Sequence, residues 1–227
     1  MATLFPKLSF RTLRSQIEEK VRDAVLNGSL RPGERLVERK LADQFGASLT
    51  AVREALISLE AAGFVVRKPN SSTCVIEFSL SEVEKAFEFR RVLEGYAIEE
   101  AVRLAAPQQI QAIERCYLEM VDAAGRGEQS LFLQKDLEWH EAIWRAADNE
   151  YLLMALRRLV LPLFAFSAIR IYSGRPLDLL ADAYRHQAML QAIQTKDLQG
   201  GRDALNRAID EWLSVLRAWE RNVNEDH

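Results

Sequence analysis

The sequence predicts a mainly α-helical protein whose only β structure is a small hairpin in the first third of the chain. Leu, Ala, Glu and Arg dominate the 227 residues, whereas glycine (10) and proline (6) are scarce, which favours helix. Two short β-branched segments, 64–67 and 74–78, interrupt the helical pattern. From residue 80 onward the apolar periodicity is helical. These observations predict one domain over residues 1–78 and an all-helical domain over residues 79–227.

The first helix of the N-terminal domain is predicted over residues 9–27, where apolar residues repeat every four positions. Two further helices joined by a tight turn are expected over residues 36–63. In the first of these, Leu36, Leu41 and Phe45 fall on one face. Gly46 can adopt the left-handed conformation that ends it. This pattern is shared by a helix-turn-helix and by an ordinary helical hairpin.

The second helix of this pair has a polar N-terminus that contains an arginine. Ser48 is placed to cap it, and Val52, Leu56 and Leu59 form its apolar face, so that Arg53 points elsewhere. The strands 64–67 and 74–78 follow, separated by the turn-forming residues KPNSST. A winged helix-turn-helix has this order of elements: a helix, a helix pair and then a β-hairpin. The order therefore favours a winged helix-turn-helix over an ordinary helical hairpin.

The C-terminal domain is predicted to be an antiparallel bundle of six or seven helices. Ser81 and Glu84 have capping-box spacing at the start of the first helix, and Pro107 opens the second. A bend is expected at Pro162 within a long apolar helix. The expected helices cover residues 80–105, 107–124, 130–147, 151–172, 177–195 and 198–223.

Charge and composition restrict the class of protein. The net charge is −3, but residues 1–78 carry 12 Lys/Arg against 9 Asp/Glu, and residues 79–227 carry 18 against 24. A basic first third joined to an acidic remainder fits a nucleic-acid-binding module. The apolar segment 159–169 is too short to span a membrane, and no signal peptide is visible. Cys74 and Cys116 show no pairing signature, which predicts the cytoplasm.

Several of these segments resemble a known family. The run PGERLVERKLADQFGASLTAVREALISLEAAGFV resembles the DNA-binding signature of the GntR family of bacterial transcription regulators. The runs EFRRVLEGYAIEEAVRLAA, DLEWHEAIWRAADNEYL and YRHQAMLQAIQTKD resemble the FCD-type effector-binding domain of its FadR subfamily. The resemblance extends over about residues 9–209. It implies a cytoplasmic, ligand-responsive homodimer, most often a repressor, that binds a palindromic operator in double-stranded DNA and is not an enzyme.

Carried over residue by residue, the resemblance identifies four candidates for DNA contact: Arg39, Ser48, Thr50 and Arg53. A guanidinium can pair with guanine O6 and N7 or with phosphate. Alternatively, the two arginines are solvated or paired with Glu38 and Glu54. The chain departs from the family pattern at Leu49, where an arginine is usual, and in the wing, which reads Asn70-Ser71-Ser72 in place of Asn-Arg-Gly.

Asp136 and His140 are four residues apart, so both project from one face of a helix and can share a divalent ion such as Zn, Ni or Mn. The resemblance adds His186 as a third ligand and places the fourth ligand position on Ala208, which cannot bind a metal. The sequence leaves open a second interpretation, in which Asp136 only orients His140 within a polar pocket.

The resemblance also places Arg90 in the effector pocket, where a guanidinium can bind a carboxylate in a bidentate manner. The competing interpretation is a surface arginine paired with Glu94 at i+4. The predicted pocket is polar on one side (Arg90, Asp136, His140, His186) and apolar on the other (Phe164, Phe166, Tyr172). This combination suits a small carboxylate effector.

Three functions are compatible with these features. A ligand-responsive transcription regulator accounts for the winged helix and the pocket together. A metal-dependent hydrolase would use Asp136, His140 and His186, but it has no evident general base and no use for a winged helix. An architectural DNA-binding protein would have a dimerisation bundle and no effector, which leaves Arg90 beside the metal-like residues without a role.

Overall fold

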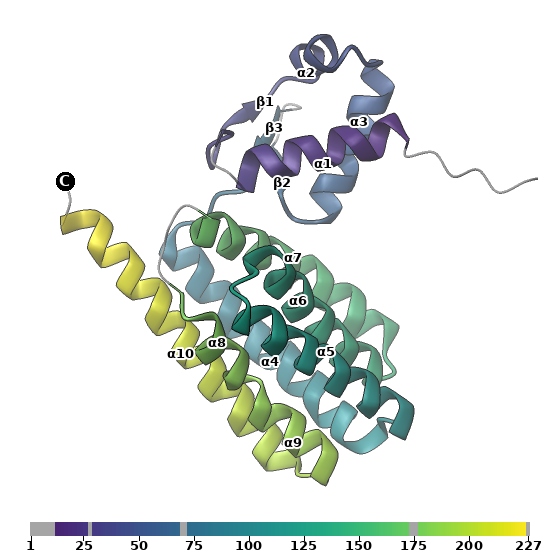
Figure 1. Cartoon of the computed structure of the whole chain (residues 1–227), viewed down its shortest axis with the longest axis vertical. Coiled ribbons are helices and arrows are strands. Elements are labelled where there is room, and N and C mark those ends of the chain that lie inside the picture. The colour runs from purple at the N-terminus through teal and green to yellow at the C-terminus, as the bar shows by residue number, and fades with distance from the viewer. Residues whose placement is uncertain (1–11, 27–28, 69–71, 173–176, 226–227) are drawn as a thin grey trace, which may run out of the picture. The chain divides into compact units, whose positions relative to one another are not determined.

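The computed structural model describes residues 12–26, 29–68, 72–172 and 177–225. The chain divides into two compact units, Met1–Glu77 and Phe78–His227. The described residues form ten helices and a three-stranded sheet (Figure 1). The first unit contains a helix pair followed by a β-hairpin, and the second is entirely helical. The predicted fold class is therefore confirmed.

The first unit is built on one apolar interface between its first and third helices. Its elements are α1 (Leu13–Leu26), β1 (Arg35–Leu36), α2 (Glu38–Phe45), α3 (Leu49–Ala61), β2 (Val65–Lys68) and β3 (Ser72–Val75). Helix α1 packs against α3. The buried residues Ile17, Val21 and Val25 of α1 and Val52, Ala55, Leu56 and Leu59 of α3 have the helical spacing seen in the sequence.

The turn between α2 and α3 forms as the sequence predicts. Gly46 ends α2 in the left-handed region at φ 59°, which costs glycine little. Ser48 then caps α3, since its Oγ accepts the N–H of Ala51 at 3.2 Å. The cap and the apolar face together orient the solvent-exposed side of α3.

The sheet has the order β1-β3-β2 and is antiparallel throughout. Val66 pairs with Cys74 on one side of β3, and Leu36 pairs with Thr73 on the other. The prediction that Leu36 belongs to the first helix of the pair was wrong, because Leu36 lies in β1 and α2 begins at Glu38. A two-residue strand is too short to show alternation in the sequence. The turn residues 69–71 lie outside the described residues.

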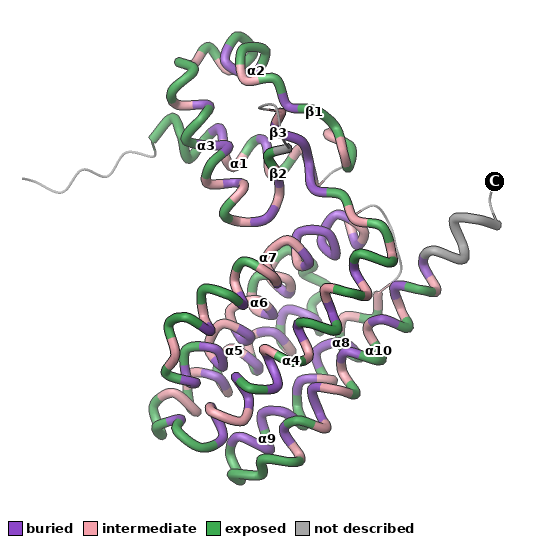
Figure 2. Tube along the Cα trace, turned by 180° about the vertical axis from the view of Figure 1, so that it is seen from behind, coloured by how far each residue is buried: buried purple, intermediate pink, exposed green. Residues whose placement is uncertain are grey.

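The second unit is a bundle of seven helices among the residues described. They are α4 (Leu80–Leu104), α5 (Pro107–Gly125), α6 (Gln129–Ala146), α7 (Glu150–Tyr172), α8 (Leu179–Arg185), α9 (Gln187–Thr195) and α10 (Leu198–Glu225). Helix α5 packs along α6, and α10 packs along α4 and α9 (Figure 1). The buried residues lie along the inner faces of these helices (Figure 2), which places the core between them.

Helix α7 is the most apolar element and continues through Pro162. By length and composition alone it could cross a membrane, and it is the one described helix for which this holds. At 23 residues it extends well beyond the apolar segment 159–169, which is too short by itself to span a membrane. In the bundle, Leu156, Val160 and Leu163 are fully buried, as expected for the core helix of a globular unit.

Two predicted details of the second unit were wrong. The capping box of α4 is formed by Ser79 and Glu82, whose side chains each bond the other residue's backbone N–H, and not by Ser81 and Glu84. The segment contains two overlapping Ser-x-x-Glu patterns, and the helix extends to the earlier one. The helix predicted over residues 177–195 is divided into α8 and α9 at His186.

Candidate functional site

The N-terminal half of α3 and its N-cap residue include three of the four predicted DNA-contact residues. Ser48, Thr50 and Arg53 are exposed, but the Ser48 hydroxyl is already engaged in capping α3. Arg53 is 59% exposed, and its Nε donates to Oε2 of Glu38 at 2.7 Å. The pair engages one edge of the guanidinium, while Nη1 and Nη2 form the edge that can span guanine O6 and N7.

Arg39, the fourth predicted residue, lies in the first turn of α2 and is exposed. Its neighbour Glu38 is the residue that holds Arg53, so the two helices are linked at this point. Of the alternatives considered for Arg53, the ion pair within the protein is therefore the one that forms, and Glu38 is the partner. Because this pair is on the surface, it contributes at most about 1 kcal/mol, which a base or phosphate contact can exceed.

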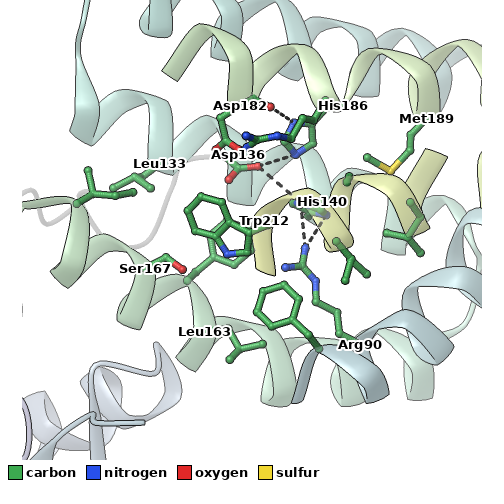
Figure 3. Close-up of a pocket in the computed structure, with 17 residues that line it drawn as sticks. Arg90, Leu133, Asp136, His140, Leu163, Ser167, Asp182, His186, Met189 and Trp212 are labelled. Atoms are coloured by element: carbon green, nitrogen blue, oxygen red, sulfur yellow. Dashed lines mark hydrogen bonds and ion pairs between the residues drawn. The ribbon is translucent and has the colours of Figure 1, made fainter. Parts of the chain in front are cut away.

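A cavity of about 70 Å³ lies inside the second unit and contains all four predicted effector residues (Figure 3). Its polar wall comes from α4, α6 and the α8–α9 junction, and its apolar wall comes mainly from α7 and α10. The polar lining residues are Arg90, Asp136, His140, Ser167, Asp182, Arg185 and His186. Ala208 also lines the cavity, at the position that the family resemblance assigns to a fourth ligand.

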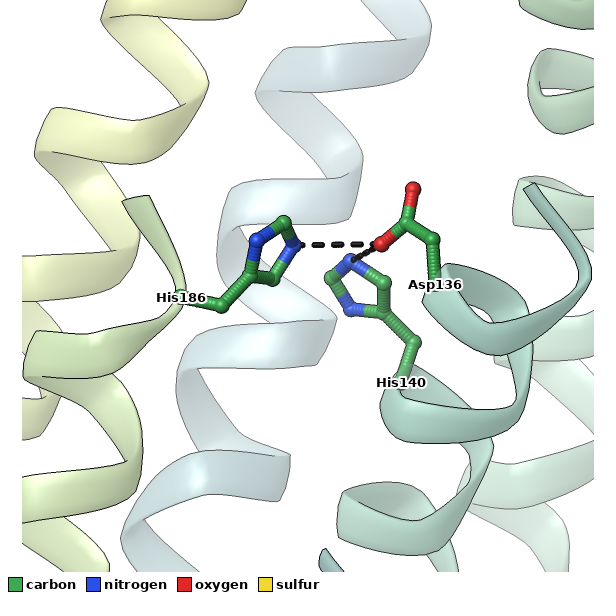
Figure 4. A group of neighbouring side chains, drawn as sticks. All are labelled: Asp136, His140 and His186. Atoms are coloured by element: carbon green, nitrogen blue, oxygen red, sulfur yellow. Dashed lines mark ion pairs between the residues drawn. The ribbon is translucent and has the colours of Figure 1, made fainter. Parts of the chain in front are cut away.

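Asp136, His140 and His186 converge in this cavity (Figure 4). All three are buried, and one ligand atom from each lies within 4.8 Å of the others. Oδ1 of Asp136 is 3.1 Å from Nε2 of His186 and 3.6 Å from Nε2 of His140. Despite this proximity, Oδ1 has no hydrogen-bond partner of suitable geometry among the described residues. A buried carboxylate oxygen facing two imidazole nitrogens in this way fits a bound cation.

Neighbouring groups fix both imidazole rings. Nδ1 of His186 lies 3.0 Å from the backbone carbonyl oxygen of Asp182, and Nδ1 of His140 lies 3.0 Å from Oε1 of Glu94. Both partners are acceptors, so each Nδ1 carries a proton and each Nε2 is directed toward Asp136. Metal-binding histidines are usually oriented in this way by a carbonyl or carboxylate behind them.

The pKa values reflect this crowding of buried charge. Burial opposes ionisation of Asp136, but His186 beside it holds the pKa of Asp136 below its ordinary value. Burial likewise disfavours the charged form of His186, yet Asp136 raises the pKa of that imidazole. For His140 burial dominates and lowers the pKa. Burial and the nearby charge of Asp136 raise the pKa of Asp182 to about 6.

Arg90 combines the two interpretations left open by the sequence. It is buried and lines the cavity, and it is also paired with Glu94, since Nε donates to Oε2 at 2.6 Å. Its Nη2 lies 3.2 Å from Nε2 of His140, and its guanidinium carbon lies 5.2 and 5.7 Å from the ring centroids of Phe87 and Phe164. Arg90 is therefore held in place by the protein and is not a surface residue.

Glu94 was not predicted from the sequence to be a buried partner of Arg90 and His140. This carboxylate is almost fully buried, accepts from Nε1 of Trp144 at 3.0 Å, and contacts both Arg90 and His140. Burial opposes its charge, but Arg90 and His140 hold the pKa of Glu94 well below its ordinary value. Its i+4 spacing from Arg90 was visible in the sequence, whereas its burial was not.

The aromatic wall was predicted only in part. Phe164 lines the cavity, whereas Phe166 and Tyr172 are not among the described residues that do. Phe166 packs edge-on against Phe78 at 5.7 Å and lies beneath the Arg170 guanidinium. Trp212 of α10 contributes to the wall instead, and no sequence pattern distinguished it from the other core aromatics.

Comparison with known proteins connects this cavity and the winged helix to a family. Residues 13–75 match the model of bacterial regulatory proteins of the gntR family, and residues 85–211 match the FCD domain. The chain belongs to the GntR family. The FCD match begins within α4 and ends within α10, includes every cavity-lining residue except Trp212, and is consistent with the FadR subfamily.

The relatives of this GntR-family chain are transcription regulators, and the matches extend over nearly the whole length of both chains. It is 24% identical to the HTH-type transcriptional regulator McbR of Escherichia coli (92% of this chain, 95% of McbR). It is 27% identical to a probable D-xylose utilization operon transcriptional repressor of Paenarthrobacter nicotinovorans (91% and 90%). It is 26% identical to the gluconate operon transcriptional repressor of Bacillus subtilis (88% and 86%).

The fold is also that of solved regulators. The structure of Escherichia coli McbR/YncC superimposes with a TM-score of 0.73 at 23% identity, covering 93% of this chain and 100% of that one. The family and its relatives are DNA-binding transcription regulators, so the prediction that the chain is not an enzyme is confirmed. The hydrolase alternative is thereby excluded.

Proposed function

We propose that this protein is a cytoplasmic, effector-responsive repressor that binds a palindromic operator as a homodimer. The observation that carries the effector part is the cavity of the second unit, where the buried side chains of Asp136, His140 and His186 converge beside the fixed guanidinium of Arg90. A plain dimerisation bundle has no need for buried charges, which are costly to keep there. Relatives named as repressors of the D-xylose and gluconate operons support repression.

In this proposal α3 enters the major groove and places Arg53, Thr50 and Ser48 at base edges or phosphates, while Arg39 approaches the backbone. The first unit (residues 1–77) contacts the sugar–phosphate backbone of each DNA half-site, and the second unit binds the effector. Effector binding changes operator affinity only as far as the effector prefers one arrangement of the dimer over the other, typically by 5- to roughly 150-fold.

The cavity fits a divalent ion held by Asp136, His140 and His186, in the range of Zn, Ni or Mn. When bound, such an ion supplies positive charge and open coordination positions for oxygen ligands. Ala208 provides no ligand atom at the fourth family position, which leaves room for water or an effector oxygen. Arg90 Nη2 and a cation need the same lone pair on His140 Nε2, so these two contacts are alternatives.

The effector class follows from charge and size. An ion at the triad and the guanidinium of Arg90 both favour a carboxylate. The cavity of about 70 Å³ is roughly half of the 150 Å³ cavity that holds a benzene molecule, so the effector has only a few heavy atoms within it. We therefore propose a small carboxylate. We propose no membrane partner.

The dimer is proposed to use the exposed face of α4. Phe89, Val92 and Tyr96 are exposed at helical spacing on this helix, on the side away from Arg90 and Glu94. Large apolar side chains gathered on one exposed face are typical of subunit interfaces. Two copies of this face would meet across a two-fold axis, which matches the symmetry of a palindromic operator.

The proposal is tested by fluorescence anisotropy and sedimentation with the DNA upstream of the protein's own gene. We expect a sequence-specific complex with two chains per duplex, weakened by rising salt and shifted at least fivefold by one member of a panel of small carboxylates. Val92→Glu should bind DNA weakly because it does not dimerise. Absence of any specific complex contradicts the regulator, and a complex indifferent to every carboxylate identifies an architectural protein instead.

Metal binding is tested on the purified full-length chain by elemental analysis and chelator competition. After exposure to Zn, Ni or Mn we expect about one ion per chain, with affinity lowered about 100-fold or more in His186→Ala, because loss of a direct ligand costs at least as much as loss of a supporting residue. His227→Ala removes a histidine that is not part of the triad and should retain the ion. Wild-type protein that binds none of the three contradicts the assignment.

A further inference from the structure

We propose that Leu49 reads a thymine methyl group in each operator half-site and sets the sequence preference of this regulator together with Arg53. The inference depends on the proposed function, because it takes α3 as the helix that enters the major groove. It assigns a specificity-determining role to a residue that cannot form any side-chain hydrogen bond. The chemistry it predicts for the DNA is a T·A pair at a fixed distance from a G·C pair.

The position of Leu49 supports this role. It is the first residue of α3 and directly follows the Ser48 cap, so the capping bond fixes the backbone that carries it. Leu49 precedes Val52 and Leu56 by three and seven residues, so it continues the apolar stripe of α3 at its N-terminal end. Val52, Leu56 and Leu59, the inner members of this stripe, are fully buried and form the core of the unit. Leu49 remains 37% exposed beyond that core. The N-terminal turn of a recognition helix is the part that reaches base edges.

The chemistry of its neighbours narrows what Leu49 can recognise. The Ser48 hydroxyl is engaged by Ala51, and Arg53 is oriented by Glu38, so Arg53 is the arginine of α3 that can contact a guanine. A leucine in the major groove offers apolar surface alone. The thymine C5-methyl is the apolar group that a standard base pair presents there, so thymine is the base favoured by Leu49.

The spacing of the two contacts follows from helix geometry. Leu49 and Arg53 are one turn apart, which is about 6 Å along the helix axis. Successive base pairs are separated by about 3.4 Å. The thymine read by Leu49 should therefore lie one or two base pairs from the guanine read by Arg53, in both half-sites.

The test removes the methyl group alone. Duplexes selected by the full-length protein from a randomised library are prepared with each thymine replaced in turn by uracil, which differs only at C5. At one position per half-site we expect about fourfold weaker binding of wild-type protein. This ratio corresponds to roughly 0.8 kcal/mol for one buried methylene-sized group. The same replacement should change binding of Leu49→Ala by less than about 1.5-fold, since the contact is already absent.

Two variants sharpen the result. Ile57→Ala removes the other exposed aliphatic side chain of α3, which is 51% exposed and two turns away, and should leave the uracil effect at that position intact. Leu49→Arg should change the preferred base there from thymine to guanine, because an arginine pairs with O6 and N7. A uracil effect of equal size in wild type and Leu49→Ala at every position would overturn the inference.

The same measurements separate the thymine contact from the regulator function. If wild type selects no specific duplex, the regulator proposal itself is wrong. If a specific duplex is selected and Arg53→Gln weakens it, but no uracil effect depends on Leu49, only the thymine contact is refuted.

Discussion

Replacing Arg53 by glutamine is expected to weaken binding to the specific operator by about 30- to 10⁴-fold. A bidentate contact between arginine and guanine is worth about 1–3 kcal/mol, and a dimer makes it twice, so about 2–6 kcal/mol is lost. Binding to unrelated DNA should fall by less than about tenfold, because that binding depends on phosphate contacts. Anisotropy titrations on both duplexes at one salt concentration measure the two ratios.

Arg103→Gln is a matched control for this substitution. Arg103 is similarly exposed, at 52%, and is also paired with a glutamate, Glu100, but it lies on α4 of the second unit. The change in net charge is the same in both variants. Equal loss of affinity for specific and unrelated DNA in Arg53→Gln would contradict base reading and would assign Arg53 to phosphate.

Replacing Glu94 by alanine is expected to destabilise the second unit by about 3–5 kcal/mol, because the buried charge of Arg90 is left without its partner. Nε1 of Trp144 and Nδ1 of His140 lose their acceptor in the same step. For a unit of this size the loss corresponds to a fall in Tm of roughly 6–20 °C. Thermal and urea unfolding of the full chain in the presence of a chelator provide the measurement.

A second i,i+4 pair shows what burial contributes to this effect. Asp122 in the last turn of α5 and Arg126 at its C-cap form a pair of comparable length at 2.9 Å, but both are exposed. Asp122→Ala should cost less than about 1 kcal/mol. The double variant Arg90→Met with Glu94→Gln should recover part of the lost stability, since it removes both buried charges. A cost for Glu94→Ala as small as that for Asp122→Ala would contradict the role assigned to the pair.

The sequence was most informative where a short segment determines its own structure. The stop at Gly46, the cap at Ser48 and the apolar face of α3 depend on neighbouring residues, and all three formed as predicted. Strand β1 was missed because a two-residue strand exists only through its pairing with β3. The capping box was predicted two residues too late because two Ser-x-x-Glu patterns overlap in the sequence. Which of them is used depends on where the helix begins in the folded bundle.

The effector site was less predictable than the DNA-binding helix. Asp136 and His140 were paired by helical spacing, and His186 was added through the family resemblance, and the structure brings all three together. The break between α8 and α9 at His186 was not visible in a sequence pattern that is helical on both sides.

By itself, the sequence determined the winged helix followed by a helical bundle, the residues along the exposed face of α3, and the spacing that places Asp136 with His140. These features follow from local periodicity, capping and turn chemistry, which act over a few residues. Only the tertiary structure decided that Arg90 and Glu94 form a buried pair, that Glu94 orients His140, and that Trp212 replaces Phe166 and Tyr172 in the wall. Burial and ring orientation depend on contacts between helices far apart in the chain, and no local pattern encodes them.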